Sequence, residues 1–280
     1  MAAESLWGGY SGSGAATMMS NCQVIANTAS YYSGSGGGLG GGIYIDPQYN
    51  DNSGPIVVVD SVIAANVAHG RGTGITTCYT GAGDRYPRLP TNNTIIKNCR
   101  IYGNTNLSAT GGGGAYLQNT DYGAGVYTNG PVVMINCTIA GNQSGALGGG
   151  VLAGATNNYV ENCIINCIIY SNTTTGDDYD EIYNNNALNT NNYSHTCIRP
   201  TAGADTTPAP EGNITNDPSF VNQANNNYHL SPNSPCINTG TNQDWMMNSV
   251  DLDGRQRIRY IIVDMGAYER LHSGTICSFH

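Results

Sequence analysis

Acidic side chains crowd together in one short stretch of the chain. Within GDDYDEIYNNN, Asp177, Asp178, Asp180 and Glu181 fall inside five residues. Carboxylate oxygens are the ligands that Ca²⁺ takes in proteins, and paired carboxyl groups can also exchange protons in acid–base catalysis. The stretch therefore predicts a ligand-binding or catalytic cluster, with a solvent-exposed acidic turn as the alternative.

A second candidate site combines acidic, basic and aromatic side chains. Asp84, Arg85, Tyr86 and Arg88 lie close together in CYTGAGDRYPRLPTNN, a stretch that also contains two prolines. Loops that leave a repetitive scaffold on one face are common places for binding sites. We interpret this segment as a ligand-binding loop, or otherwise as a solvated insertion.

The same residues are the best candidates for polysaccharide cleavage. A lyase acting on an acidic polysaccharide requires a base, often Lys or Arg, and a cation beside the substrate carboxylate. The single lysine, Lys97, lies inside the strand-like run IIKNCRIY, where it points outward beside Arg100 only if the strand bends. The Asp84 loop and the Asp177–Glu181 cluster are therefore the better catalytic candidates.

Sequence repeats indicate the elements that must position these residues. The unit PVVMINCTIAGNQSGALGGGVLA, residues 131–153, contains the pattern Asn-Cys-x-Ile-x-x-Asn. Related segments begin at Asn21, Asp60, Asn98 and Asn166, running through Ile25, Ile63, Ile101 and Ile169 respectively, and successive Cys or Ser positions are 39, 38, 38 and 30 residues apart. A near-constant period of this length is typical of a solenoid.

Glycine-rich runs alternate with these cores, as in GGGIY, GGGAY, GAGVY and GGGVL. Apolar residues do not recur at helical spacing, so each repeat is expected to form two or three short strands without a helix. This pattern predicts an all-β fold, a right-handed parallel β-helix with long loop insertions and an irregular C-terminal cap. Equivalent asparagines should then bond from coil to coil.

We divide the single domain into the coils with their N-terminal cap, residues 1–192, and a C-terminal capping region, residues 193–280. Trp7 and Tyr10 in LWGGYSG are expected to cover the first coil and to contact a neighbouring molecule if copies join end to end. The C-terminal region is rich in proline, which is consistent with a long connection across the end of the helix.

The composition excludes several kinds of partner. The net charge is −9 and only 10% of residues are charged. An acidic protein is poorly suited to bind nucleic acid or anionic membrane surfaces, or to capture acidic polysaccharides tightly without assistance. The sequence contains no apolar run long enough for a transmembrane helix, and MAAESLWGG is unlike a signal peptide, so we expect the mature form of an extracellular or cell-surface protein.

Nine cysteines match no zinc signature. Cys22, Cys99 and Cys137 share one repeat position, which favours a column of small buried side chains over disulfides between coils. Cys197 and Cys236 lie outside the regular repeats, and we predict a disulfide between them.

The C-terminal third resembles a tail found in bacterial exported β-helix proteins. Four motifs occur in order: Asn216–Val221 (NDPSFV), Tyr228-His229-Leu230 with Ser234–Ile237 (SPCI), Asp251–Gly254 (DLDG) with Arg257, and Asp264–Glu269 (DMGAYE). They are similar to those of pectin-lyase-like proteins with a choice-of-anchor tail, and the glycine and Asn repeats look more loosely like polymorphic outer-membrane adhesins. The resemblance implies attachment at a bacterial cell surface.

Charge in this tail also has a physical interpretation. Asp251, Asp253 and Asp264 lie near Arg255, Arg257 and Arg259 in sequence, so ion pairs that clamp the last coil are expected. Calcium at Asp251 and Asp253 is the alternative, although DLDG is far shorter than a full calcium loop.

We expect a non-enzymatic structural, adhesive or assembly role, including filament formation, with the protein itself or surface glycans as partners. A polysaccharide lyase or glycoside hydrolase is the first alternative. A carbohydrate-binding module is the second, with Tyr44, Tyr116 and Tyr127 stacking on sugar rings. No cofactor is required by any of these, and calcium is compatible with each.

Overall fold

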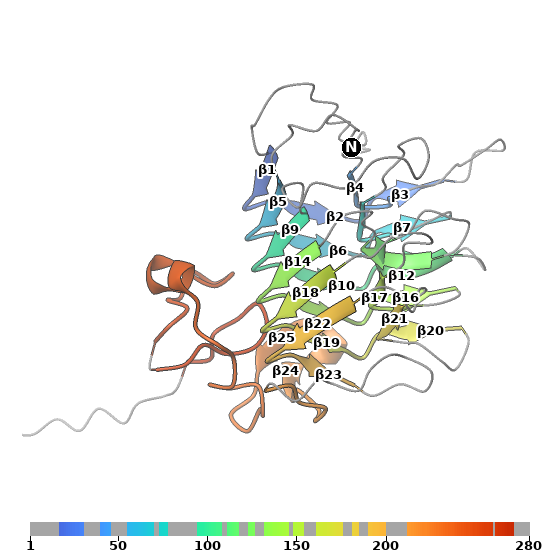
Figure 1. Ribbon diagram of the computed structural model, residues 1–280. Helices are drawn as coiled ribbons and strands as arrows, with labels where there is room; N and C mark the ends of the chain where they lie inside the picture. The colour runs from blue at the N-terminus through green and yellow to red at the C-terminus, as the bar shows by residue number, and fades with distance from the viewer. Residues whose placement is uncertain are drawn as a thin grey trace, which may run out of the picture.

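The computed structural model is a stack of parallel β-sheets with a C-terminal tail folded along its side (Figure 1). It describes residues 17–30, 40–45, 55–69, 73–77, 94–107, 111–117, 123–126, 132–145, 148–153, 161–175, 181–184, 190–199, 212–259 and 261–271. Adjacent strands within the stack come from successive repeats, about one coil apart in sequence. The chain is therefore a parallel β-helix, as predicted.

Four parallel sheets run along the stack. Sheet A contains β1 (Thr17–Ser20), β5 (Ile56–Val59), β9 (Thr94–Lys97), β14 (Val132–Ile135), β18 (Glu161–Ile165) and β22 (Thr190–Ser194). Sheet B contains β2 (Gln23–Ile25), β6 (Val62–Ala64), β10 (Arg100–Tyr102), β15 (Thr138–Ala140), β19 (Ile168–Tyr170) and β23 (Cys197–Ile198).

The other two sheets use shorter or glycine-rich strands. Sheet C contains β3 (Thr28–Ala29), β7 (Val67–Ala68), β11 (Thr105–Asn106), β16 (Gln143–Ser144) and β20 (Thr173–Thr174). Sheet D contains β4 (Ile43–Ile45), β8 (Ile75–Thr77), β12 (Gly111–Leu117), β17 (Val151–Ala153) and β21 (Ile182–Asn184), with β13 (Gly123–Val126) paired to β12. Each complete coil thus has four strands, more than the two or three expected, because the two-residue strands of sheet C leave no periodic pattern in the sequence.

A single residue in the left-handed conformation makes the turn between sheets A and B. This position is occupied in successive coils by Asn21, Asp60, Asn98, Asn136, Asn166 and His195, with φ between 48° and 55°. Asn and Asp adopt this conformation more readily than most residues, which explains the Asn that begins each repeat.

The residue after this turn closes it with a side-chain hydrogen bond. The Cys, Ser or Thr side chain there donates to the carbonyl oxygen two residues earlier at 2.7–3.3 Å, as in Ser61 to Val59 and Cys137 to Ile135. Of the predicted column, Cys99 and Cys137 are fully buried, whereas Cys22 in the first coil is only partly buried. Cys167 continues the column and is also fully buried. A small side chain with a donor fits the position, so Ser61 and Thr196 can replace cysteine.

The core is a set of straight columns of apolar side chains. Ile63, Ile101, Ile139 and Ile169 stand in register in sheet B and are 0% exposed. Burying each contributes about 1.5–3 kcal/mol. Val24 occupies this column in the first coil, whereas Ile25, which the repeat alignment placed there, faces outward and is 43% exposed.

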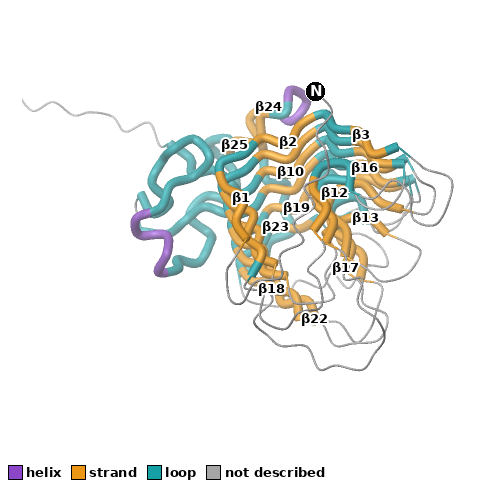
Figure 2. The backbone as a smooth tube through the Cα atoms, turned by 90° about the horizontal axis from the view of Figure 1, so that it is seen from above, coloured by secondary structure: helices purple, strands orange, loops and turns teal. Residues whose placement is uncertain are grey.

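The tail packs against the side of the solenoid rather than only over its end. It contains the antiparallel pair β24 (Phe220–Asn222) and β25 (Asn227–Leu230) and the 3₁₀ turns η1 (Gln223–Asn225) and η2 (Asp244–Asn248). Figure 2 shows these elements beside β1, β2 and β10, away from β12 and β17. The coils continue through β23, beyond the boundary that we placed at residue 192.

Apolar contacts hold the tail against the outer face of sheet B. Tyr228 and Tyr268 pack with Ala140 and Tyr102, while Leu230 and Met265 pack with Ile168. Glycine suits position 141 at this contact, because its φ is 65° and a Cβ there would lie 2.8 Å from the Tyr228 hydroxyl.

Candidate functional site

An asparagine ladder runs through the interior of the stack, as predicted. The ladder begins at Asn27 in the first coil and continues through four fully buried asparagines, Asn66, Asn104, Asn142 and Asn172. Each Oδ1 from Asn66 onward accepts both the backbone N–H and the side-chain amide of the asparagine one coil earlier, at 2.9–3.1 Å. The ladder fixes coil register by satisfying buried polar groups.

Glu181 terminates this ladder. Its Oε2 accepts the side-chain amide of Asn172 at 2.6 Å and the backbone N–H at 3.2 Å, and its Oε1 accepts from Arg199 Nε at 2.8 Å. Burial raises the pKa of Glu181 to about 7, although the Asn172 and Arg199 contacts oppose the shift. Glu181 is thus a structural group inside the protein, while Asp177, Asp178 and Asp180 lie outside the described residues.

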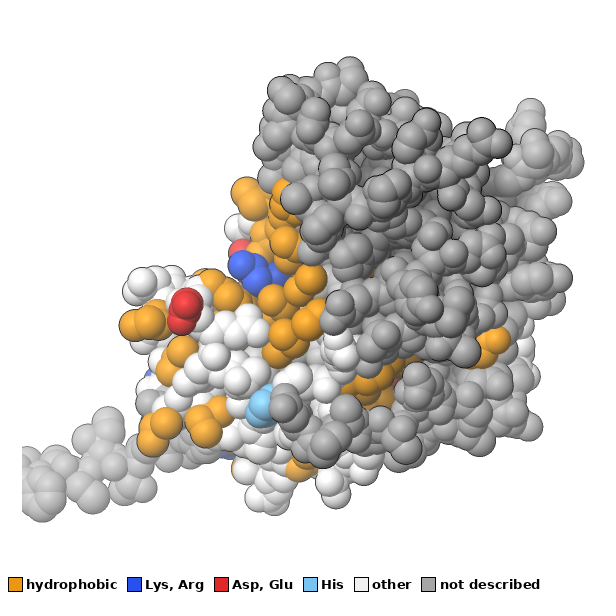
Figure 3. All heavy atoms as spheres, viewed as in Figure 1, with side chains coloured by type: hydrophobic (Ala, Val, Ile, Leu, Met, Phe, Trp, Pro, Cys, Tyr) orange, Lys and Arg blue, Asp and Glu red, His pale blue; other side chains and the backbone are white. Residues whose placement is uncertain are grey.

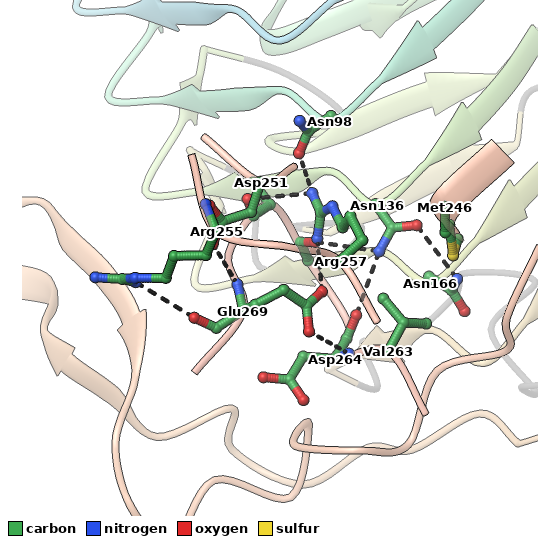
Figure 4. Close-up of polar contacts among 12 residues, drawn as sticks. Asn98, Asn136, Asn166, Met246, Asp251, Arg255, Arg257, Val263, Asp264 and Glu269 are labelled. Atoms are coloured by element: carbon green, nitrogen blue, oxygen red, sulfur yellow. Dashed lines mark hydrogen bonds and ion pairs between the residues drawn. The ribbon is translucent and has the colours of Figure 1, made fainter. Parts of the chain in front are cut away.

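Arg257 fastens the tail to the solenoid. Its fully buried guanidinium donates to Asn98 Oδ1, to the carbonyl oxygens of Gly266 and Ala267 at 3.0 and 3.2 Å, and to Glu269 Oε1 at 3.0 Å. Figure 4 shows the Arg257 side chain between Asn98 of the solenoid and Glu269 of the tail. Burial raises the pKa of Glu269 to about 8, against the opposing effect of Arg257.

The left-handed turn residues supply the rest of this attachment. Asn98 Nδ2 donates to the Val250 carbonyl at 3.0 Å, and Asn136 Nδ2 donates to that of Asp264 at 3.3 Å. Asn166 exchanges two hydrogen bonds with Thr241, at 2.7 and 2.9 Å. The tail therefore clamps three successive coils, not only the last one, because the turn asparagines form a polar column that the tail follows.

Of the acidic tail residues expected to form ion pairs, Asp253 does so with Arg255 at 2.7 Å, whereas Asp251 and Asp264 accept backbone N–H groups. Asp251 accepts the backbone N–H groups of Asp253, Arg255 and Glu269 at 2.7–2.9 Å. Asp264 likewise accepts from Asn238 and Arg270, both at 2.7 Å. These carboxylates hold tail loops in shape, and Asp253 is ion-paired, so the contacts of Asp251 and Asp253 disfavour calcium. Across the described ranges no group of three His, Cys, Asp or Glu side chains is placed to hold a metal ion.

A pocket of about 400 Å³ opens beside this clamp, in the tail. Its polar lining comprises Asn227, His229, Asp253, Arg255, Glu269 and Arg270. Val221, Pro232 and Leu271 form part of its apolar wall. We call this the tail pocket; it is the best candidate ligand site among the described residues because charged and apolar side chains converge there.

His229 is held firmly in the tail pocket. Its Nε2 lies 2.7 Å from Asp253 Oδ2, and its Nδ1 lies 2.6 Å from Asn227 Oδ1. That amide oxygen also accepts the His229 backbone N–H at 3.2 Å, which fixes the orientation of the amide. The ring packs on Tyr268 with a centroid distance of 4.1 Å. Both ring nitrogens lie within hydrogen-bonding distance of an oxygen atom, so the ring is held on both sides.

Arg255 completes the charged part of the pocket. Its Nη1 lies 2.7 Å from the same Asp253 oxygen and donates to the Glu269 carbonyl at 3.3 Å. His229, Asp253 and Arg255 are each about one-third exposed, so the three groups meet at the protein surface.

Two further sequence-derived candidates that the structure describes, Lys97 and Tyr44, are not part of the tail pocket lining. Lys97 points outward from the end of β9, where the chain does bend, and its ammonium lies 4.2 Å from the centroid of the Trp245 ring. Tyr44 is half-buried in β4. The candidates Trp7, Tyr10, Asp84, Arg85, Tyr86, Arg88 and Tyr127, together with the side chain of Tyr116, lie outside the described residues.

The predicted disulfide between Cys197 and Cys236 is not formed in the structure. Both are buried thiols in one apolar cluster with Ile168, Leu230 and Met265. Hydrogen bonding to Cys236, together with burial, raises the pKa of Cys197.

Comparison of the chain with protein-family models, with curated proteins and with solved structures finds no match. In the part of the chain that is described, neither short 3₁₀ turn has the length and apolarity needed to cross a membrane.

Sequence reasoning missed the tail pocket. Tyr228-His229-Leu230 was singled out only as part of a family resemblance, and Arg270 was not considered. The one signal in the sequence is that His229 and Asp253 each belong to a tail motif. They are 24 residues apart, and this separation gives no indication that they are in contact.

Proposed function

We propose that this protein is a non-enzymatic β-helix with an adhesive role at the cell surface or outside the cell, and that the tail pocket is its ligand-binding site. The observation that carries this proposal is the pairing of His229, Asp253 and Arg255 with one another. This pairing fixes the positions of polar groups in a pocket that also has an apolar wall, and fixed polar groups within an apolar lining are typical of ligand-binding sites.

The buried acids of the described chain also support a non-enzymatic role. Glu181 and Glu269 are buried in internal contacts, and Asp251 and Asp264 are occupied by backbone N–H groups. A lyase or hydrolase reaction would therefore have to use side chains elsewhere, such as the Asp84 loop.

Binding and cleavage can be separated with one set of glycans. Labelled protein should be retained by an immobilised glycan panel, and Asp253→Ala should weaken retention while the exposed control Asp244→Ala should not. Incubation with polyuronates should release no unsaturated, ultraviolet-absorbing products. Release of such products, or retention unaffected by Asp253→Ala, would contradict the proposal.

Self-assembly is a second candidate, favoured by the outer face of sheet A. Val57, Ile95 and Val133 stand in register along this face and are half-buried, and Met18 beside them is 66% exposed. Figure 3 shows apolar side chains gathered in a strip over these strands. A second copy would present the same columns at the same strand spacing of about 4.8 Å, so the two faces can interdigitate.

Assembly through this face is testable by light scattering. Ile95→Lys should lower the apparent mass at high protein concentration, and Met247→Lys, an exposed apolar residue on the tail, is the matched control. A wild-type protein that stays monomeric across the concentration range would rule this candidate out.

A further inference from the structure

We propose that the tail pocket recognises a single carboxylate-bearing sugar residue, an acidic monosaccharide at a chain end or branch. This inference rests on the proposed adhesive function and adds the chemical class of the ligand.

Unused guanidinium groups provide the site for a carboxylate. Arg270 lines the pocket, and its side chain makes no hydrogen bond or ion pair with the described residues. Its backbone is nevertheless held, because its N–H donates to Asp264 Oδ2 at 2.7 Å. Arg255 uses only Nη1, which leaves Nε and Nη2 as donors. Guanidinium groups bind carboxylates by paired, charge-assisted hydrogen bonds.

The local charge of the pocket is opposite to that of the whole protein. Arg255 and Arg270 face one exposed carboxylate, that of Asp253, while the Glu269 carboxylate is turned inward to Arg257 at 3.0 Å. A pocket with more basic than acidic groups favours an anion, although the protein carries a net charge of −9.

The rest of the lining suits a sugar ring better than a simple anion. Asp253 Oδ1 and Asn227 Nδ2 have no hydrogen-bond partner among the described residues, so they remain available for hydroxyl groups. Val221 and Leu271 are 53% and 46% exposed, and they offer an apolar surface for the C–H face of the ring. Carboxylate, hydroxyl and apolar contacts together define an acidic sugar.

The net charge restricts the length of the ligand. A long polyuronate would place many carboxylates against a surface with a charge of −9, and the resulting repulsion opposes its binding. One acidic residue inserted into the tail pocket avoids most of this repulsion. We therefore expect free glucuronic acid to compete for the site and long polyuronates to compete poorly.

The test is a calorimetric or NMR titration of the full chain with glucuronic acid, glucose and acetate. Glucuronic acid should bind more tightly than either of the others, because glucose lacks the carboxylate and acetate lacks the sugar ring. Arg270→Gln should weaken glucuronic acid binding by about 10- to 100-fold, the range for losing a charged hydrogen bond. Arg259→Gln, an exposed arginine outside the pocket lining, is the matched control.

The outcomes separate this inference from the proposed function. Equal binding of glucose and glucuronic acid, lost in Asp253→Ala, would overturn the acidic ligand but keep a glycan-binding pocket. If acetate binds as tightly as glucuronic acid, the pocket is a simple anion site and the proposal of a sugar ligand is wrong. Binding that Arg270→Gln leaves unchanged would remove the ligand from this pocket, and binding of none of the three, together with no retention on the glycan panel, would overturn both proposals.

Discussion

Glu181 takes the place of the next asparagine beyond Asn172. Its Oε2 receives the same two hydrogen bonds that an asparagine Oδ1 receives elsewhere in the ladder, at 3.2 and 2.6 Å. A ladder that runs in one direction leaves two donors unmatched at its end. Glu181 satisfies both, and Arg199 compensates its charge from the partly exposed side.

Removing this terminator should destabilise the solenoid. Glu181→Ala leaves two buried N–H donors of Asn172 without an acceptor, so the free energy of unfolding should fall by about 2–3 kcal/mol. Urea unfolding followed by circular dichroism measures the loss. The exposed Asp244→Ala should change stability little, and a Glu181→Ala protein as stable as wild type would show that the ladder needs no terminator.

Stability should fall as the pH rises from mildly acidic to mildly alkaline. The folded-state pKa values of Glu181 and Glu269 are raised from the ordinary 4.5 to about 7 and about 8. Between pH 4.5 and these raised values the folded protein holds protons that the unfolded chain has released. The stabilisation from the two protonated carboxyl groups is therefore full below pH 4.5, and it is lost as the pH passes about 7 for Glu181 and about 8 for Glu269.

Glutamine variants test this assignment. Glu181→Gln should flatten the pH profile mainly near pH 7 and Glu269→Gln mainly near pH 8, measured as the urea midpoint at several pH values. A wild-type midpoint that rises over the same range would contradict the raised pKa values.

The repeat pattern was sufficient to predict the solenoid but not its number of strands. The column of Asn66 and Asn104 appears in sequence as equal spacing, and equal spacing is what stacking requires. The two-residue strands of sheet C, such as β7, are too short to show alternation. The sequence thus predicts the length of a coil more readily than the number of strands in it.

Replacing one asparagine of the ladder should lower the free energy of unfolding by the contribution of several hydrogen bonds. Asn104→Ala removes the acceptor of two Asn66 donors and the donor to Ile63 O and Asn142 Oδ1. We expect a loss of about 2–4 kcal/mol, because buried groups remain unsatisfied on both neighbouring coils. Thermal unfolding measures it against the exposed Asn233→Ala, and similar midpoints for the two variants would refute the role of the ladder.

The tail was harder to predict from the sequence because its contacts are distant. Asn98 and Arg257 are 159 residues apart, and neither pattern nor spacing connects them. Sequence reasoning correctly expected ion pairs around the DLDG motif, but it placed them on the last coil. Most acids of the tail accept backbone N–H groups instead, a role that depends on loop geometry and not on residue type alone.

Loss of Arg257 should release the tail, and more so at high pH. Arg257→Ala removes four hydrogen bonds to Asn98, Gly266, Ala267 and Glu269, and leaves the buried Glu269 carboxyl without its cation. Breaking a buried ion pair from one side costs about 3–5 kcal/mol. Because Arg257 opposes the rise in the pKa of Glu269, the uncompensated carboxyl should be neutral at low pH and costly once ionised. The defect should therefore grow as the pH rises, and Arg257→Ala combined with Glu269→Gln should lose that pH dependence.

Fluorescence of Trp245 can report this release, because the ring lies over Lys97 of the solenoid only when the tail is docked. The measurement uses a Trp7→Phe background, so that Trp245 is the one remaining tryptophan. In Arg257→Ala the emission should shift to longer wavelength and tail cleavage by protease should accelerate. An unchanged spectrum and unchanged cleavage at alkaline pH would mean that apolar packing on sheet B holds the tail without Arg257.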